Sequence, residues 1–279
     1  MKRTLSLGYS PCPNDTFIFY ALVHGRIPIE GLHIEERLED VETLNRLALD
    51  GALDLTKISY HALGHLRERY VLLRSGGALG RGCGPLVVAR QETEMTRLRG
   101  KKIAIPGELT TANLLLQLCG EGYGNVLVLP FHRVMAAVAR GEADAGVIIH
   151  ESRFTYRQHG LVKVRDLGAW WEEETGLPIP LGGILARREL GTELIEDIDR
   201  ALAQSVRYAF AHPEETSDYI KNHSQELSDE VIRQHIALYV NDFSFDLGEE
   251  GSRAIETLFG RAEARGIIPA CDLPLFSSH

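Results

Sequence analysis

One histidine in this sequence occupies a position where a proton-transfer group would be useful. His150 follows the apolar run Gly-Val-Ile-Ile (146–149), which is typical of a buried strand. Ligands of open α/β sheets bind beyond the carboxyl ends of the strands, and histidine is the usual general base near neutral pH. The position therefore favours a catalytic base, with a structural histidine as the alternative. Glu151 and Arg153 follow directly and could orient the ring.

Two segments that join a strand to a helix could bind an anion. Residues 11–16 (PCPNDT) separate the alternating stretch 4–10 from the apolar run 16–25, and residues 110–112 follow the strand-like segment IAIPGE. Backbone N–H groups at a helix start can bind a carboxylate without a basic side chain. We expect both starts to face one cleft, with plain helix capping as the alternative. The residues concerned are Ser10, Asn14, Asp15, Thr16, Thr110, Thr111 and Ala112.

Three more polar residues belong to a neighbouring helix–strand unit. Lys57 and Ser59 end the strand-like segment LDLTKIS, so they could donate to a carboxylate or a hydroxyl. Asn45 lies on the preceding amphipathic helix and is a weaker candidate. A structural role for the lysine or the serine is an equally good interpretation.

Metal and redox chemistry find little support in the sequence. His61 and His65 are spaced like a zinc pair, but no His-Glu-x-x-His motif accompanies them. The four cysteines, including Cys12, show no Cys-x-x-Cys spacing, which favours ordinary buried thiols in a reducing compartment. The glycine-rich stretch 76–84 lacks the Gly-Lys-Ser/Thr of a phosphate loop. Trp170 and Trp171 fit either a core or an aromatic floor of the site.

A weak internal repeat indicates two lobes built on one plan. Leu44, Leu47, Ala48, Gly51 and Asp54 match Val134, Ala137, Val138, Gly141 and Asp144, each at an offset of 90 residues. Each set reads as a helix, a glycine stop and a strand. The fold class expected is α/β with two lobes.

Two segments are expected to join the lobes as a two-strand hinge. PLVVAR (85–90) would leave the first lobe and IPLGGILARREL (179–190) would return to it. The predicted large lobe comprises residues 1–88 and 184–279, and the small lobe residues 89–183. Residues from 193 onward read mostly as helices that pack on the large lobe.

Charge and composition narrow the class of partner. The net charge of −9 argues against nucleic acid or an anionic membrane, so an anionic ligand must be attracted locally. The first residues show no leader-like apolar stretch, and no run of about 18 apolar residues appears. We therefore expect a cytoplasmic protein that acts on a small molecule.

Several motifs together resemble one enzyme family. SPCPNDTFIFYALVHG, LEDVETLN, LTKISY, RSGGALGRGCGPLVVAR, TTA and AGVIIHESRFTY are similar to the 1,4-dihydroxy-6-naphthoate synthases of the futalosine route to menaquinone. The resemblance covers nearly the whole chain. It implies the two-lobed fold of type 2 periplasmic binding proteins with a central cleft.

The resemblance also implies an activity and site residues. It implies a lyase that opens cyclic dehypoxanthinyl futalosine and aromatises it to 1,4-dihydroxy-6-naphthoate, with release of the sugar-derived part and without a cofactor. By position, His150 matches the family's catalytic base. The matching substrate-binding positions are Lys57, Ile58, Ser59, Thr111, Ala112 and the cleft-lining Asn45.

Two alternatives from other classes remain open. A solute-binding protein with the same fold would lack catalysis, although His150 and the leaderless N-terminus count against it. A chorismate dehydratase-like sister enzyme is the second, and the motifs SPCPNDTF and HESRFTY favour the naphthoate synthase over it. The sequence does not indicate an oligomeric state.

Overall fold

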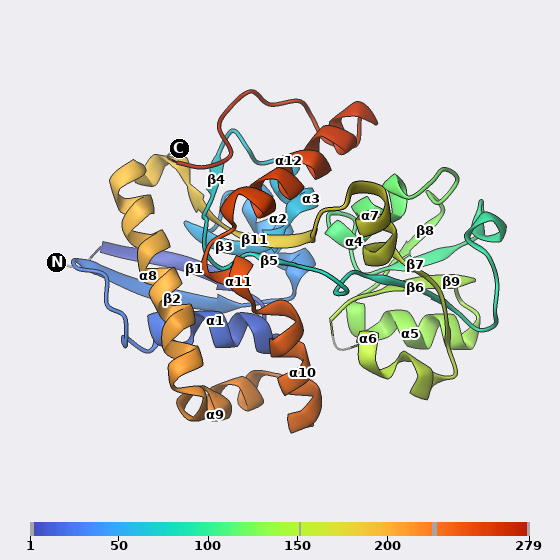
Figure 1. Ribbon diagram of the computed structural model, residues 1–279, viewed down its shortest axis with the longest axis horizontal. Coiled ribbons are helices and arrows are strands. Elements are labelled where there is room, and N and C mark those ends of the chain that lie inside the picture. The colour runs from blue at the N-terminus through green and yellow to red at the C-terminus, as the bar shows by residue number, and fades with distance from the viewer. Residues whose placement is uncertain (1–2, 151, 225–227, 278–279) are drawn as a thin grey trace.

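The computed structural model describes residues 3–150, 152–224 and 228–277. Two lobes lie side by side, each with a central sheet and helices against it (Figure 1). This confirms the α/β, two-lobed fold class predicted from the repeat. The N-terminal residues belong to the lobe drawn on the left and the middle of the chain to the lobe on the right.

The sheet of the first lobe mixes parallel and antiparallel pairs. Its main path runs β2-β1-β3-β11-β4, and β5 pairs with β11. β1 is parallel to β2 and β3, whereas β11 is antiparallel to β3, β4 and β5. The bounds are β1 Arg3–Tyr9, β2 Leu32–Leu38, β3 Leu55–Ser59, β4 Tyr70–Leu72, β5 Ala78–Gly80 and β11 Ile179–Arg187.

The second sheet repeats part of this arrangement. Its order is β10-β6-β9-β7-β8, with β7 parallel to β8 and β9, and with β6 antiparallel to β9 and β10. The strands are β6 Leu86–Ala89, β7 Ile103–Ile105, β8 Val126–Val128, β9 Ala145–Ile148 and β10 Val162–Asp166. In both lobes the carboxyl ends of the parallel strands, and the starts of the helices that follow them, face the space between the lobes.

The chain changes sheet in two neighbouring places. One crossing lies between β5 and β6, at residues 81–85, and the other precedes β11, at residues 176–178. Gly80 and Ile179 are register partners there, so the two crossings run together, as a two-strand hinge requires. Residues 86–88 pair in the second sheet, although we predicted them in the large lobe. Residues 179–183 pair in the first sheet, although we predicted them in the small lobe. The lobe boundaries therefore shift toward 81–85 and 176–178, and as domain limits they stay a prediction.

Helices cover both sheets. The first lobe carries α1 Pro13–Val23, α2 Val41–Leu49 and the short α3 Tyr60–Gly64. The second lobe carries α4 Thr111–Leu118, α5 Phe131–Arg140, α6 Ser152–Thr155 and α7 Leu167–Thr175. Short 3-10 turns are Met95–Leu98, Tyr156–His159 and Arg188–Leu190.

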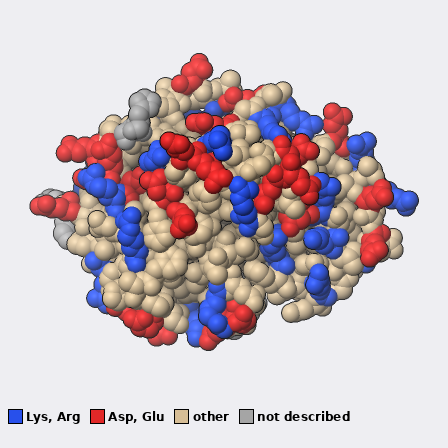
Figure 2. All heavy atoms as spheres, viewed as in Figure 1, with Lys and Arg blue, Asp and Glu red and all other residues tan. Residues whose placement is uncertain are grey.

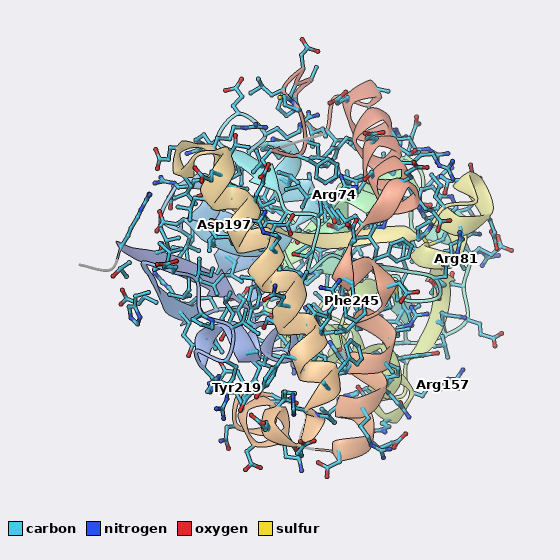
Figure 3. The ribbon with its side chains drawn as sticks, turned by 60° about the vertical axis from the view of Figure 1, so that its left-hand side comes forward. Arg74, Arg81, Arg157, Asp197, Tyr219 and Phe245 are labelled. Carbon is cyan, nitrogen blue, oxygen red and sulfur yellow. The ribbon has the colours of Figure 1, made fainter. Side chains whose placement is uncertain are left out.

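The last part of the described chain is mostly helical, as predicted. Its helices are α8 Thr192–Ala211, α9 Pro213–His223, α10 Asp229–Tyr239, α11 Asp242–Phe245 and α12 Gly248–Ala264. Helices α8, α9 and α10 all contact α1 of the first lobe. Phe245 lies beside α8 (Figure 3), and its ring packs against Phe210 of that helix with centroids 5.5 Å apart. These helices hold α1 firmly in place.

The two lobes are in contact behind the cleft. One buried hydrophobic cluster runs without a break from Leu63 of the first lobe to Leu114 and Val147 of the second. Polar contacts join the same sides: the Leu109 amide donates to Glu42 Oε2 at 3.2 Å, and Arg46 Nη2 lies 3.1 Å from Glu108 Oε2. Apolar and polar contacts thus join the two lobes in the described structure.

Charged side chains of both signs are mixed on the face of the molecule shown in Figure 2. Among the described residues, no helix is long and apolar enough to cross a bilayer.

Candidate functional site

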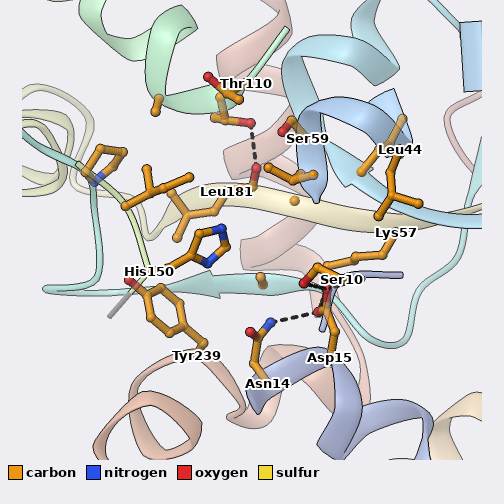
Figure 4. A pocket seen from close by; sticks show the side chains of 18 of the residues that line it. Ser10, Asn14, Asp15, Leu44, Lys57, Ser59, Thr110, His150, Leu181 and Tyr239 are labelled. Atoms are coloured by element: carbon orange, nitrogen blue, oxygen red, sulfur yellow. Dashed lines mark hydrogen bonds and ion pairs between the residues drawn. The ribbon is translucent and has the colours of Figure 1, made fainter. Parts of the chain in front are cut away.

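A cavity lies between the lobes and collects most of the predicted site residues. It contains about 700 Å³ of space not filled by atoms, including the part open to solvent. The predicted residues that line it are Ser10, Asn14, Asp15, Lys57, Ile58, Ser59, Thr110, Thr111, Ala112 and His150 (Figure 4).

The start of α1 forms one side of the cavity, but the helix begins earlier than predicted. Asn14, Asp15 and Thr16 were expected near its N-cap, whereas the helix starts at Pro13 and Cys12 is the N-cap. Proline is well suited to the first helical position because its φ is already helical and its missing N–H is not needed. Asn14 and Asp15 therefore lie in the first turn. Thr16 donates to the Cys12 carbonyl at 3.0 Å and is not among the lining residues.

Asp15 is the centre of a buried polar network. Its Oδ2 accepts from Ser10 Oγ at 2.7 Å and from the Ser10 amide at 3.2 Å. Its Oδ1 accepts from Asn14 Nδ2 at 2.7 Å and lies 3.5 Å from Lys57 Nζ. The carboxylate is thus already surrounded by protein donors. This side of the cavity is rigid because its polar groups satisfy one another.

Lys57 reaches this network from β3. Its Nζ also donates to the Gly76 carbonyl at 2.7 Å. Burial lowers the pKa of the Lys57 amine, and the nearby Asp15 opposes that shift. Two of its three possible hydrogen bonds are directed at protein, which leaves one for a ligand.

Ser59, at the end of β3, faces the cavity with Asn45 behind it. Asn45 Nδ2 donates to Ser59 Oγ at 3.3 Å, and the Ser59 amide donates to Asn45 Oδ1 at 3.0 Å. We expected Asn45 to line the cleft, and this was wrong: its side chain is fully buried in the first lobe. Its role in the structure is to orient Ser59, whose hydroxyl hydrogen remains for another acceptor.

The start of α4 forms the opposite side of the cavity, from the second lobe. Thr110 is the N-cap, and its side chain accepts from the Asn113 amide at 3.3 Å. Helix geometry gives the amides of Thr111 and Ala112 no intrahelical acceptor. The Thr111 hydroxyl donates to the Leu181 carbonyl of β11 at 2.5 Å. The amides, rather than this hydroxyl, are the donors left for an anion.

His150 lies where the sequence predicted, beyond the end of β9. It has a φ of +54°, which is unusual for any residue except glycine and is the one such case among the described non-glycine residues. Residues held in this conformation often mark functional sites. The imidazole lines the main cavity and also a smaller one that contains Cys12 and Phe131. His150 is therefore accessible from two sides.

Sequence reasoning missed most of the apolar wall and one helix. Tyr239 of α10 lines the cavity beside His150 (Figure 4), together with Val41, Leu44, Ala78, Cys83, Pro85, Ile149, Leu181 and Gly182. The glycine at position 182 is the one sequence feature that hints at this wall. A side chain does not fit there, since a Cβ would lie 2.7 Å from the Ile58 carbonyl oxygen. Tyr239 has no such signal, because an aromatic residue on a helix is usually core.

The other described candidate residues make contacts that are typical of structural roles. His61 Nδ1 lies 3.3 Å from the Thr110 carbonyl, and burial lowers the pKa of His61 to about 4. Arg153 pairs with Asp166 at 2.8 Å, and Glu151 lies outside the described residues. Trp171 is fully buried, with its indole N–H on the Pro178 carbonyl, which assigns it to the core.

One possible metal-binding group occurs within the described ranges. His212, Glu214 and Glu215 come together at the start of α9, on the surface and apart from the cavity. The predicted absence of a metal and of a cofactor stays a prediction.

Comparison with known proteins places the chain in a family. A sequence model of the menaquinone biosynthesis family matches residues 5–264. A 1,4-dihydroxy-6-naphtoate synthase of Thermus thermophilus is 60% identical over 98% of this chain and 99% of its own. A crystal structure of a protein from Archaeoglobus fulgidus has a TM-score of 0.89 at 40% identity, covering 95% of this chain and 98% of that one.

A more distant likeness identifies the fold. The periplasmic aliphatic sulphonate binding protein of Escherichia coli has a TM-score of 0.66 at 14% identity, over 97% of this chain and 90% of that chain. The periplasmic-binding-protein fold expected from the sequence is thereby confirmed. Because the family model and the Thermus relative both extend over nearly the whole chain, this protein belongs to the menaquinone biosynthesis family.

Proposed function

We propose that this protein is a lyase that converts cyclic dehypoxanthinyl futalosine to 1,4-dihydroxy-6-naphthoate. The observation that carries the proposal is the position of His150 in a cavity between the lobes of a chain 60% identical to a naphtoate synthase. The substrate is a small carboxylate, and the cavity combines apolar walls with a few polar groups, as small-molecule sites do.

The substrate carboxylate binds at the start of α4. The amides of Thr111 and Ala112 and the hydroxyl of Ser59 are neutral donors from opposite lobes, and all three residues line the cavity. Such donors, together with the partial positive charge of a helix start, stabilise an anion. The local attraction is needed because the chain as a whole carries a net charge of −9.

His150 is the general base of this reaction. Its imidazole takes a carbon-bound proton next to a carbonyl, and the electron pair left behind forms a new double bond of the aromatic ring. The bond to the sugar-derived fragment breaks as this pair moves, and the proton on the imidazolium can return to the departing fragment. General base catalysis of this kind is worth about 10²–10⁴-fold in rate.

The two other candidate functions have weaker support. A solute-binding role fits the fold, which is shared with a sulphonate binding protein, but such a role gives no reason for the strained backbone at His150. A chorismate dehydratase-like role is less consistent with the name of the relative that is 60% identical.

Incubation of the pure protein with each candidate compound separates the three functions. Cyclic dehypoxanthinyl futalosine should give the absorbance of a dihydroxynaphthoate, and chorismate should give no new chromophore. Turnover of chorismate instead would identify the sister enzyme. Binding without any turnover would identify a solute-binding protein.

Several sequence-based expectations remain predictions alongside this function. They are a cytoplasmic location, cofactor-independent turnover and the absence of nucleic-acid partners. Prolonged chelation tests the metal question directly, since activity should survive it. Loss of activity that zinc restores would revive His61 and His65 as ligands.

A further inference from the structure

Two other rings flank the ring of His150, one from each lobe. Phe131 of α5, in the same lobe as His150, presents its ring at 65° with the centroids 5.2 Å apart. His235 of α10 lies on the other lobe, and its ring is nearly parallel to that of His150, at 11° and a centroid distance of 6.1 Å. The second contact therefore forms only when the lobes are together.

His235 is fixed on the first lobe by a hydrogen bond to the network around Asp15. It is fully buried, and its Nε2 lies 2.9 Å from Asn14 Oδ1. The amide of Asn14 has one orientation available, because its Nδ2 donates to Asp15 Oδ1 at 2.7 Å. The Asn14 oxygen then faces His235, and we assign the ring hydrogen of His235 to Nε2 on this basis.

The surroundings of His235 keep it uncharged. Burial lowers the pKa of His235 well below its usual range, and a charge on His150 would lower it further. With the hydrogen on Nε2, Nδ1 carries a lone pair, and this buried atom has no hydrogen-bond partner among the described residues. A second proton there would be buried without an acceptor. His235 is thus a poor competitor for any proton that His150 takes up.

The groups facing His235 from each neighbouring element are few. Tyr239 follows one turn later on α10, with ring centroids 4.7 Å away. Asn14 and, behind it, Asp15 come from α1, and His150 follows β9. Among these groups, only His150 belongs to the second lobe.

We propose that His235 is a positioning residue: the first lobe presents its ring as a flat surface that sets the plane of the His150 imidazole when the lobes close. This proposal rests on the proposed role of His150 as the base. It also couples lobe closure to catalysis, because the base is correctly placed only where the two rings meet.

The test separates the ring of His235 from its hydrogen bond. His235→Phe keeps a flat ring but loses the bond to Asn14, whereas His235→Gln keeps a hydrogen-bonding group but loses the ring. A small misplacement of a reacting group can lower a rate by up to about 100-fold. We expect His235→Gln to lower kcat about 10- to 100-fold with KM within threefold, and His235→Phe to recover most of the loss.

A matched control is available on the same helix. Ile232 is buried one turn earlier on α10 and does not line the cavity, so Ile232→Ala tests loss of helix packing alone. It should leave kcat within about twofold. Circular dichroism and binding of 1,4-dihydroxy-6-naphthoate to each variant establish that the fold and the cavity survive.

The outcomes distinguish this proposal from the proposed function. If the unmodified protein forms no naphthoate, the function itself is wrong. If it turns over and His150→Ala is inactive, but His235→Gln and His235→Phe have equal kcat values, the positioning role is refuted. A change confined to KM would refute it as well. Should His235→Gln fail to fold, His235→Phe alone decides, since a folded variant with kcat reduced 10-fold or more contradicts the proposal.

Discussion

The two helix starts that face the cavity look alike in sequence, but they differ in which hydrogen-bonding groups remain available to a ligand. Each follows a strand, each comes from a different lobe, and each was expected to bind an anion. At α1, the polar side chains of the first turn are bonded to one another and to Lys57. At α4, the N-cap Thr110 serves its own helix, and the amides of Thr111 and Ala112 remain.

The difference follows from one side chain. Asp15 brings a negative charge into the first turn of α1, so that helix start already has its anion. The first turn of α4 contains no acidic residue. A helix start with its own carboxylate is part of the framework, and one without it is available to a ligand. This difference favours our proposal that the substrate carboxylate binds at α4, with α1 in a structural role.

The largest effect should come from removing the charge at α1. Asp15→Asn leaves the buried Lys57 ammonium without its counter-ion, and breaking a buried pair in this way costs about 3–5 kcal/mol. We expect the free energy of unfolding in urea to fall by about 3 kcal/mol or more. The double variant Asp15→Asn, Lys57→Met should regain part of the loss. A single variant as stable as the original would mean that α1 is not a framework element.

A smaller effect is expected from the amide at the start of α4. Thr111→Pro removes one N–H at the first helical position, where proline is tolerated, and Thr110 already has the extended backbone that precedes proline well, with ψ of 145°. Loss of a hydrogen bond to a charged group costs about 1.5–3 kcal/mol. Titration should show naphthoate binding weakened by roughly tenfold or more.

The control for this variant keeps the amide. Thr111→Val loses only the hydroxyl, whose hydrogen is directed at Leu181, so its binding should fall less than that of Thr111→Pro. Equal affinities for the two variants would remove the amide from the account.

The smallest effect should be that of Ser10→Ala. Its hydroxyl donates to Asp15, which retains Asn14, the Ser10 amide and Lys57 as partners. A hydrogen bond to a charged group contributes about 1.5–3 kcal/mol to stability. The affinity for naphthoate, by contrast, should change less than twofold, because the carboxylate is proposed to bind at α4. A loss of affinity as large as that of Thr111→Pro would place the carboxylate at α1 instead.

Local signals in the sequence predicted the elements and much of the site. Capping residues located the start of α4, the start of α1 was located only approximately, and the apolar run before His150 located the end of a strand. The same logic failed at Asn45, because a helical residue next to the cleft can face inward, and here it bonds to Ser59. The 3-residue error at the start of α1 arose from treating Pro13 as part of a loop.

Contacts distant in the chain were beyond sequence reasoning. His235 meets Asn14 across 221 positions and meets His150 from the other lobe. A lone histidine on an amphipathic helix has no feature that distinguishes this role from a surface position. The apolar wall, including Leu181 and Tyr239, is likewise fixed by how the lobes pack together.

The kcat of His150→Ala, measured with naphthoate binding as the check on folding, tests the central claim most directly. The account predicts a decrease of at least about 100-fold with binding retained. In the unmodified protein the rate should rise with pH as the base loses its proton, and this rise should be absent in the variant. A folded His150→Ala protein with nearly normal kcat would contradict the account, and the base would have to be another group in the cavity.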